Sequence, residues 1–191
     1  MLGKGLQLFL MDVRANTDRS SLGYWLVQGA IGGVIAGLVI AAFLMLYSAF
    51  TMGLGALFMP LRMIGGIVLG AGALEPTYPL LTAGIAGVVV HMLISAGFGM
   101  IFGAVASFVP ALLQSTAVTV AAATVFGTLT WLVDYYLIAP AAGWTWFTQG
   151  DPVVGFISHA FFFGIPLGFY TARVAQRSGA HTTVTSRAVA V

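Results

Sequence analysis

The stretch AGIAGVVVHMLISAGFGMIFGAVASFVP, from Ala83 to Pro110, contains no Asp, Glu, Lys or Arg. At a rise of 1.5 Å per residue, an α-helix of this length exceeds the roughly 30 Å hydrocarbon core of a bilayer. Small residues and one histidine recur at every fourth position, in the order Gly87, His91, Ser95, Gly99, Gly103 and Ser107. On a helix these positions share one face, which is typical of close packing between membrane helices. The stretch therefore predicts a transmembrane helix.

The composition of the whole chain agrees with a membrane environment. Of its 191 residues, 60% are hydrophobic and 6% are charged, whereas about 25% of the residues of a soluble domain are charged. The net charge of +2 comes without a block of Lys or Arg, which argues against nucleic acid as a partner. The chain has no cysteine, which excludes disulfides, thiolate metal sites and iron–sulfur clusters.

Apolar segments predict an all-α integral membrane protein, a four-span transmembrane helix bundle. The predicted spans cover about residues 22–50, 83–109, 113–138 and 153–172. Six glycines and three prolines interrupt the connection Thr51–Pro79 between the first two spans. Lipid-exposed backbone does not tolerate such breaks, so we expect an interfacial or re-entrant helix around Leu61–Leu69 rather than a fifth span. Pro166 predicts a kink in the last span.

The distribution of basic residues predicts the orientation. Four spans place both termini on one side, with six basic residues: Lys4, Arg14, Arg19, Arg173, Arg177 and Arg187. The other side keeps Arg62 alone, and basic residues collect on the cytoplasmic side. We therefore expect a multi-pass protein of the inner (plasma) membrane with both termini in the cytoplasm. Its parts are a cytoplasmic segment, 1–21, which is an interfacial helix or a frayed tail, one transmembrane domain, 22–173, and a disordered cytoplasmic tail, 174–191.

Small residues at helical spacing predict where the spans pack together. The first span carries its own four-residue repeat of glycines, so its small face and that of the second span suit one another. The predicted packing residues are Gly29, Gly33, Gly37, Gly87, Ser95, Gly99, Gly103, Gly164 and Gly168.

Four side chains form a candidate site, because ionisable groups inside a membrane are costly and are often functional. His91 and His159 lie at equal depth if the second and fourth spans run parallel, and Asp134 and Tyr135 fall near that depth in the outer half. Such a cluster suits a b-type haem, a divalent metal ion or proton transfer to a quinone. The alternative is structural, with each histidine bonded to a neighbouring helix and Asp134 paired with Arg62 or reaching the interface. No catalytic sequence motif is present.

Three segments resemble a pattern found in small uncharacterised bacterial inner-membrane proteins of about four helices. They are GLGALFMPLRMIGGIVLGAGAL (Gly53–Leu74), HMLISAGFGMIFGAV (His91–Val105) and HAFFFGIPLGFY (His159–Tyr170). The resemblance covers roughly Gly33–Tyr170 and implies a bacterial four-span protein, but no activity and no functional residue.

These features favour a non-enzymatic role as an accessory or assembly subunit of a larger, energy-transducing membrane complex. In that role the small helix faces would pack against other membrane subunits or a second copy of the chain, within the lipid bilayer. Two alternatives remain open. One is a haem-, metal- or proton-handling subunit that uses His91, His159 and Asp134, and the other is a small oligomeric transporter or channel.

Overall fold

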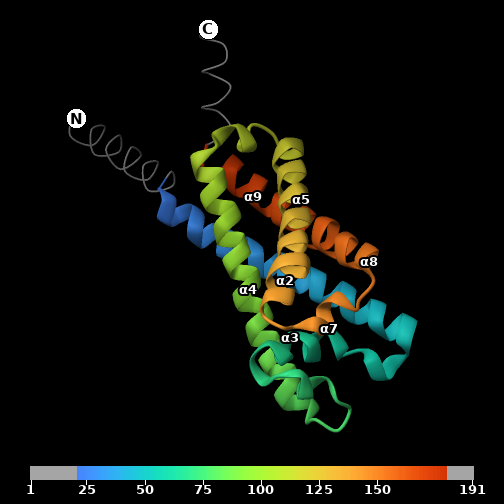
Figure 1. Ribbon diagram of the computed structural model, residues 1–191. Helices are drawn as coiled ribbons and strands as arrows, with labels where there is room; N and C mark the ends of the chain where they lie inside the picture. The colour runs from blue at the N-terminus through green and yellow to red at the C-terminus, as the bar shows by residue number, and fades with distance from the viewer. Residues whose placement is uncertain (1–20, 180–191) are drawn as a thin grey trace, which may run out of the picture.

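The structure is a computed structural model that describes residues 21–179. Predictions for residues 1–20 and 180–191 lie outside this range. Within it the chain forms helices and no strands (Figure 1). The elements are α2 (Leu22–Met52), η1 (Leu54–Ala56), α3 (Met59–Leu69), η2 (Ala71–Leu74), α4 (Leu80–Phe108), η3 (Pro110–Leu113), α5 (Thr116–Val133), η4 (Asp134–Ile138), α6 (Ala139–Ala141), α7 (Thr145–Thr148), α8 (Pro152–Ile157), η5 (Ser158–Gly164) and α9 (Ile165–Arg177).

Four helical stretches are long and apolar enough to cross a membrane, which confirms the predicted all-α four-span bundle. They are Leu22–Met52, Leu80–Phe108, Thr116–Ala141 and Pro152–Arg177. The last stretch continues four residues beyond the predicted end of the domain at residue 173. The reason is burial, because Val174 and Ala175 pack in a cluster with Trp25 and Leu113. Residues 174–177 are therefore helix rather than tail.

Local sequence accounts for where several helices begin and end. The Ser21 hydroxyl accepts a hydrogen bond from the Tyr24 N–H at the start of α2. At the start of α5, the Ser115 hydroxyl accepts one from the Val118 N–H. Such caps satisfy N–H groups that have no partner within the helix. Gly53 and Gly70 follow α2 and α3 with φ of 90° and 81°, a backbone conformation that glycine adopts without a steric cost.

The predicted interfacial or re-entrant segment contains the short helix α3. Its 11 residues correspond to about 16 Å, half the thickness of a hydrocarbon core, so α3 is too short to cross. It lies against the first half of α4, where a Cβ at Gly87 would meet the backbone of Leu61. The Arg62 guanidinium donates three hydrogen bonds of 3.0–3.1 Å to carbonyl groups of the following loop, those of Ala73, Glu75 and Tyr78. Arg62 thus fastens this loop and does not pair with Asp134.

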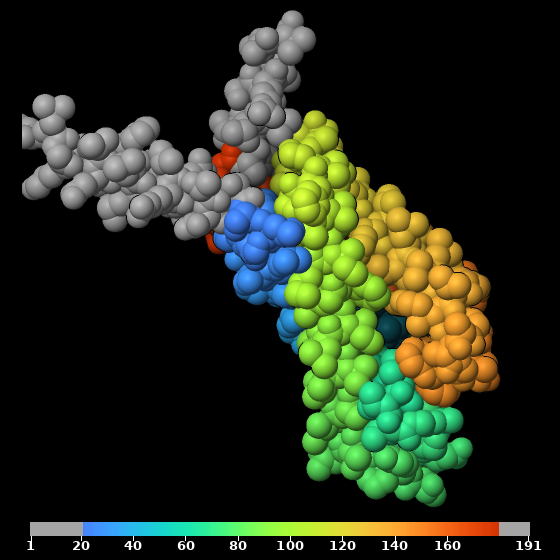
Figure 2. Space-filling model, turned by 60° about the vertical axis from the view of Figure 1, so that its left-hand side comes forward, coloured from blue at the N-terminus to red at the C-terminus, as the bar shows by residue number. Residues whose placement is uncertain are grey.

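Helices α2 and α4 cross through their small residues. A Cβ at Gly33 would meet the carbonyl oxygen of Ser95, and a Cβ at Gly99 would meet the carbonyl oxygen of Gly29. Gly37 and Gly103 extend the contact in the two directions along the crossing. Figure 2 shows the first part of α2 (blue) directly against α4 (yellow-green). The backbones approach closely because neither helix presents a large side chain here.

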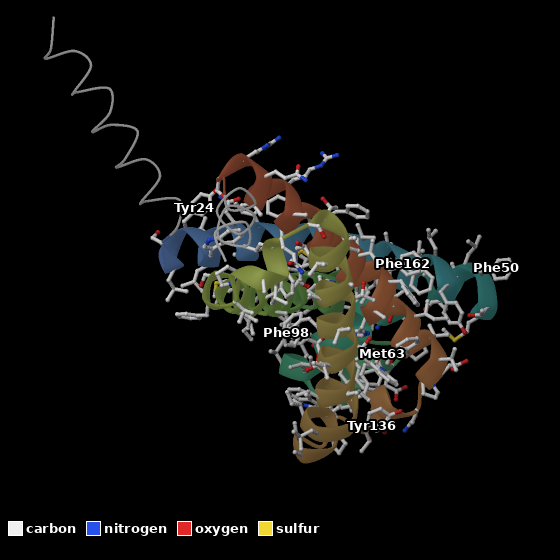
Figure 3. All side chains as sticks on the ribbon, turned by 90° about the horizontal axis from the view of Figure 1, so that it is seen from above. Tyr24, Phe50, Met63, Phe98, Tyr136 and Phe162 are labelled. Carbon is white, nitrogen blue, oxygen red and sulfur yellow. The ribbon has the colours of Figure 1, made fainter. Side chains whose placement is uncertain are left out.

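The outward surface is apolar, as expected for a protein surrounded by lipid. Phe50 is 91% exposed at the far end of α2, where Figure 3 shows it away from the other helices, and Leu54 is 84% exposed. Such side chains are unfavourable in water and suited to hydrocarbon.

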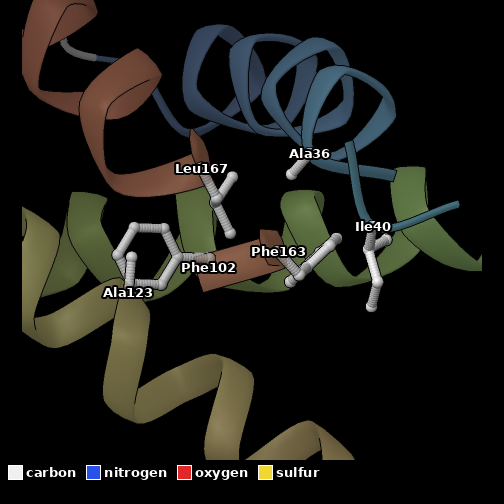
Figure 4. Close-up of a cluster of buried hydrophobic side chains, with 6 residues drawn as sticks. All are labelled: Ala36, Ile40, Phe102, Ala123, Phe163 and Leu167. Atoms are coloured by element: carbon white, nitrogen blue, oxygen red, sulfur yellow. The ribbon is translucent and has the colours of Figure 1, made fainter. Parts of the chain in front are cut away.

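The core lies where the four spans meet (Figure 4). It consists of Ala36 and Ile40 of α2, Phe102 of α4, Ala123 of α5, Phe163 of η5 and Leu167 of α9. On one side of it, α5 packs closely on the last span: a Cβ at Gly164 would lie 2.7 Å from the Cα atom of Thr124, and one at Gly168 would lie 2.6 Å from that of Val120. Two close helix pairs, α2 with α4 and α5 with the last span, therefore enclose the core.

Candidate binding cavity

Two π-helical segments position three of the four candidate site residues. Segment η4 carries Asp134 and Tyr135, and segment η5 carries His159. At the end of η4 the Ala139 N–H donates to the carbonyl of Asp134, five residues earlier instead of four. π-Helical turns are rare and frequently occur at functional sites.

Each π-helical segment ends two residues before a proline, Pro140 or Pro166. Proline lacks an N–H, and its ring clashes with the carbonyl four residues earlier in a regular α-helix. A wider turn relieves this clash, which gives a physical reason for both segments. The sequence predicted a kink at Pro166 but neither π-helical segment, although the two prolines are a signal for both.

The π-helical segments bring Tyr135 and His159 together. Their ring centroids are 5.8 Å apart and the ring planes meet at 83°, an edge-to-face arrangement. Tyr135 also meets Phe147 of α7, with centroids 6.1 Å apart. Such pairs are attractive because the positive ring edge faces the negative ring face. Side chains of η4, η5 and α7 thus form one continuous aromatic contact.

Both histidines are hydrogen-bonded to backbone carbonyl groups. Nε2 of His91 lies 2.8 Å from the carbonyl oxygen of Gly37 on α2, and Nδ1 of His159 lies 2.9 Å from that of Gly155, one turn earlier. A carbonyl oxygen can only accept, so these nitrogens are the donors. In the neutral ring the other nitrogen is then an acceptor, Nδ1 at His91 and Nε2 at His159. Each imidazole keeps one acceptor for a further partner.

All four candidate residues, His91, Asp134, Tyr135 and His159, line one cavity of about 710 Å³ between the spans. Most of its other lining is apolar and comes from α2, α3, α4 and the last span, for example Leu44, Met63 and Ile94. The cavity adjoins the core, since Ile40 and Phe163 belong to both. Two of the lining residues, Met63 and Phe98, are labelled in Figure 3.

The cavity is visible from outside the molecule. Figure 2 shows a hollow bordered by α4, α3 and the orange segment around α7, with α2 at its base. The hollow exists because α4 lies along α2 and α3 and makes little contact with α5 in the described part of the chain. On the loop side, the Trp146 indole N–H donates a 3.0 Å hydrogen bond to the carbonyl of Met63, which ties the segment around α7 to α3.

The Asp134 carboxyl group is half-buried and accepts no hydrogen bond from any residue between 21 and 179. Arg62, the basic residue that the sequence offered as its partner, instead donates its hydrogen bonds to carbonyl groups of the loop before α4. A carboxylate away from water without a partner is costly. Of the two carboxyl groups that line the cavity, Asp134 and Asp151, only that of Asp134 accepts no hydrogen bond from the described residues.

The donor set gives little support to a metal ion. The described residues include no group of three or more His, Asp or Glu side chains placed to hold one. Haem ligation by both histidines would use Nδ1 of His91, because its Nε2 already donates to Gly37.

Comparisons with known protein families, with curated proteins and with solved structures found no match. The chemistry of the cavity is therefore the basis for assigning a function.

Proposed function

We propose that this polytopic membrane protein binds an amphipathic small molecule, with a long apolar body and a small polar head, inside the bilayer. The observation that carries the proposal is the cavity of about 710 Å³ with a mostly apolar lining and a few ionisable side chains. Ligand sites in proteins have volumes of roughly 300–1,000 Å³ and combine apolar walls with a few polar groups that orient the ligand.

The position of the cavity supports a ligand that comes from the membrane. Its hollow opens between α4, α3 and the segment around α7 (Figure 2), next to the apolar outer faces of the spans. An apolar molecule dissolved in the bilayer would reach it without passing through water. Its polar head would find hydrogen-bonding partners at the two imidazoles and at Asp134, and its apolar body would contact the lining of α2 and α3.

A role as an accessory or assembly subunit has less support. It depended on small helix faces that another subunit could use, but Gly29 and Gly33 lie against Ser95 and Gly99 within this chain. Those faces are therefore occupied. The transporter and the proton-handling subunit both require a polar site between the spans, so the cavity is compatible with either, and ligand binding is the step that they share.

Binding is tested by quenching of tryptophan fluorescence in lipid nanodiscs. All four tryptophans lie in the described range, and of these only Trp144 lines the cavity. The probe is a dodecanol with two bromines at the end of its tail, because bromine quenches a nearby indole. We expect a saturable quenching component that disappears in Trp144→Phe. Quenching that rises linearly with the probe in both proteins would mean partition into lipid only, and would refute the proposal.

A matched pair of variants tests whether the saturable component comes from the cavity. Val154 lines it, while its neighbour Val153 is 60% exposed and does not. Val154→Phe fills part of the space and is expected to weaken binding at least about tenfold, which corresponds to 1.4 kcal/mol. Val153→Phe adds the same bulk on the outer surface and is expected to leave binding unchanged. Equal effects of the two substitutions would place the probe elsewhere.

A further inference from the structure

We propose that the ligand of this cavity is an amphipathic organic cation, and that the Asp134 carboxylate is its counter-ion. This inference deepens the proposed function and rests on it. It names the charge of the polar head, which the size and apolar lining of the cavity leave undefined.

The charges around the cavity favour a cation. Two carboxyl groups line it, those of Asp134 and Asp151, and no Lys or Arg does so in the part of the chain that the structure describes. Asp151 already has a structural role, because its Oδ1 accepts a 2.8 Å hydrogen bond from the Val153 N–H and caps α8. Asp134 has no such role. A ligand cation would therefore supply the partner that this carboxylate lacks among residues 21–179.

Aromatic side chains add a second attraction for positive charge. Six of them line the cavity: Tyr47, Phe98, Tyr135, Trp144, Phe147 and Phe163. The faces of such rings attract cations, most strongly where water is excluded. Tyr135 and Phe147 contact one another and line the same cavity as Asp134, so aromatic rings and the carboxylate border one space. An anionic head would meet these rings and two carboxyl groups, and would be repelled.

The remaining titratable groups of the lining are compatible with a cation. They are Tyr47 from α2, His91 from α4, Tyr135 from η4 and His159 from η5. Each histidine already donates one N–H to a backbone carbonyl, so the neutral ring offers the ligand an acceptor nitrogen. A bulky cation on an apolar tail also loses less hydration energy on entry than a compact ion.

The test compares probes that share one tail and differ in the head. Dibrominated dodecyltrimethylammonium, dodecanol and dodecyl sulfate are titrated into the protein in nanodiscs of zwitterionic lipid, and the saturable quenching of Trp144 gives each affinity. We expect the cation to bind at least about tenfold more tightly than the alcohol, and the sulfate more weakly than the alcohol. An equal or weaker affinity for the cation would overturn the inference and leave the proposed function standing. Absence of saturable quenching by any probe would remove the proposed function itself.

Substitutions then assign the charge. Asp134→Asn is expected to lower the affinity for the cation at least about tenfold and that for the alcohol less than about threefold, because the amide can still hydrogen-bond a hydroxyl head. Asp134→Glu is expected to retain cation binding. Asp151→Asn is the matched control, since asparagine also caps a helix, and its effect is expected to stay below about threefold. A larger effect at Asp151 than at Asp134 would overturn the assignment. The comparison of probes on the unmodified protein remains decisive if Asp134→Asn does not fold.

Discussion

Replacing Gly99 with alanine places one methyl group inside the crossing of α2 and α4. The new Cβ would lie 2.7 Å from both the Cα atom and the backbone nitrogen of Gly33, and closer still to the carbonyl oxygen of Gly29. Ordinary contacts of a Cβ atom begin at 3.4 Å. All three neighbours belong to the backbone, so no side chain can rotate away and the two helices must separate.

The size of the effect follows from two opposing terms. Alanine favours a helix over glycine by about 1 kcal/mol, whereas forcing extra volume into a packed contact costs about 1–3 kcal/mol and sometimes more. The contact at Gly99 involves the backbones of both helices, so we expect a cost at the upper end. A cost of about 3 kcal/mol or more, offset by about 1 kcal/mol of helix propensity, should lower the free energy of unfolding of Gly99→Ala by about 2 kcal/mol or more. Gly97→Ala is the matched control, because a Cβ at Gly97 meets nothing within 4 Å.

The measurement is reversible unfolding of the purified protein in mixed micelles, followed by circular dichroism as the fraction of denaturing detergent rises. Gly97→Ala should unfold at the midpoint of the unmodified protein or slightly above it, and Gly99→Ala clearly below. Equal midpoints for the two variants would show that the close crossing of α2 and α4 does not contribute to stability, and the reasoning would fail.

Three other predictions concern topology and local structure. Cysteines introduced at Thr77 and Gly150 should react with a membrane-impermeant maleimide from outside the cell, and one at Ser178 should not; the reverse pattern would invert the orientation. Tyr170→Phe removes the 2.7 Å hydrogen bond that the Tyr170 hydroxyl donates to Gln28 of α2, and should lower the free energy of unfolding by about 0.6–1.7 kcal/mol. An unchanged free energy of unfolding would mean that this hydrogen bond does not stabilise the fold. Arg62→Ala removes three hydrogen bonds to the loop before α4, so amide hydrogen exchange should accelerate there more than in the spans, and a uniform acceleration would contradict a local role.

The sequence predicted most of the spans because their signals are local. A run such as Ala83–Pro110 is apolar along its whole length. In a bilayer such a segment forms a helix that satisfies its own backbone hydrogen bonds, whatever the other segments do. The four-residue spacing of small residues is likewise a property of one helix. The end of the last span was less predictable, because Val174 and Ala175 are helical through burial against residues distant in sequence.

The candidate site was predictable only as a set of residue types. Membrane depth alone suggested that His91, His159 and Asp134 lie near one another, and all three line the same cavity. Their partners could not be read from the chain. The Gly37 carbonyl that accepts from His91 lies 54 residues away, and Arg62 binds loop carbonyls instead of Asp134.

The sequence by itself determined that the protein has an apolar environment, that its fold is all-α and that small residues form one face on several of its helices. Apolar length and four-residue periodicity are properties of a single segment, which is why the sequence is sufficient for these features. The tertiary structure alone decided the cavity. Its volume depends on the gap between α4 and α5, on the fit of α3 under α4, and on two π-helical segments that turn Tyr135 toward His159. These are properties of how helices meet, and the energy that selects them comes from contacts between segments far apart in the chain.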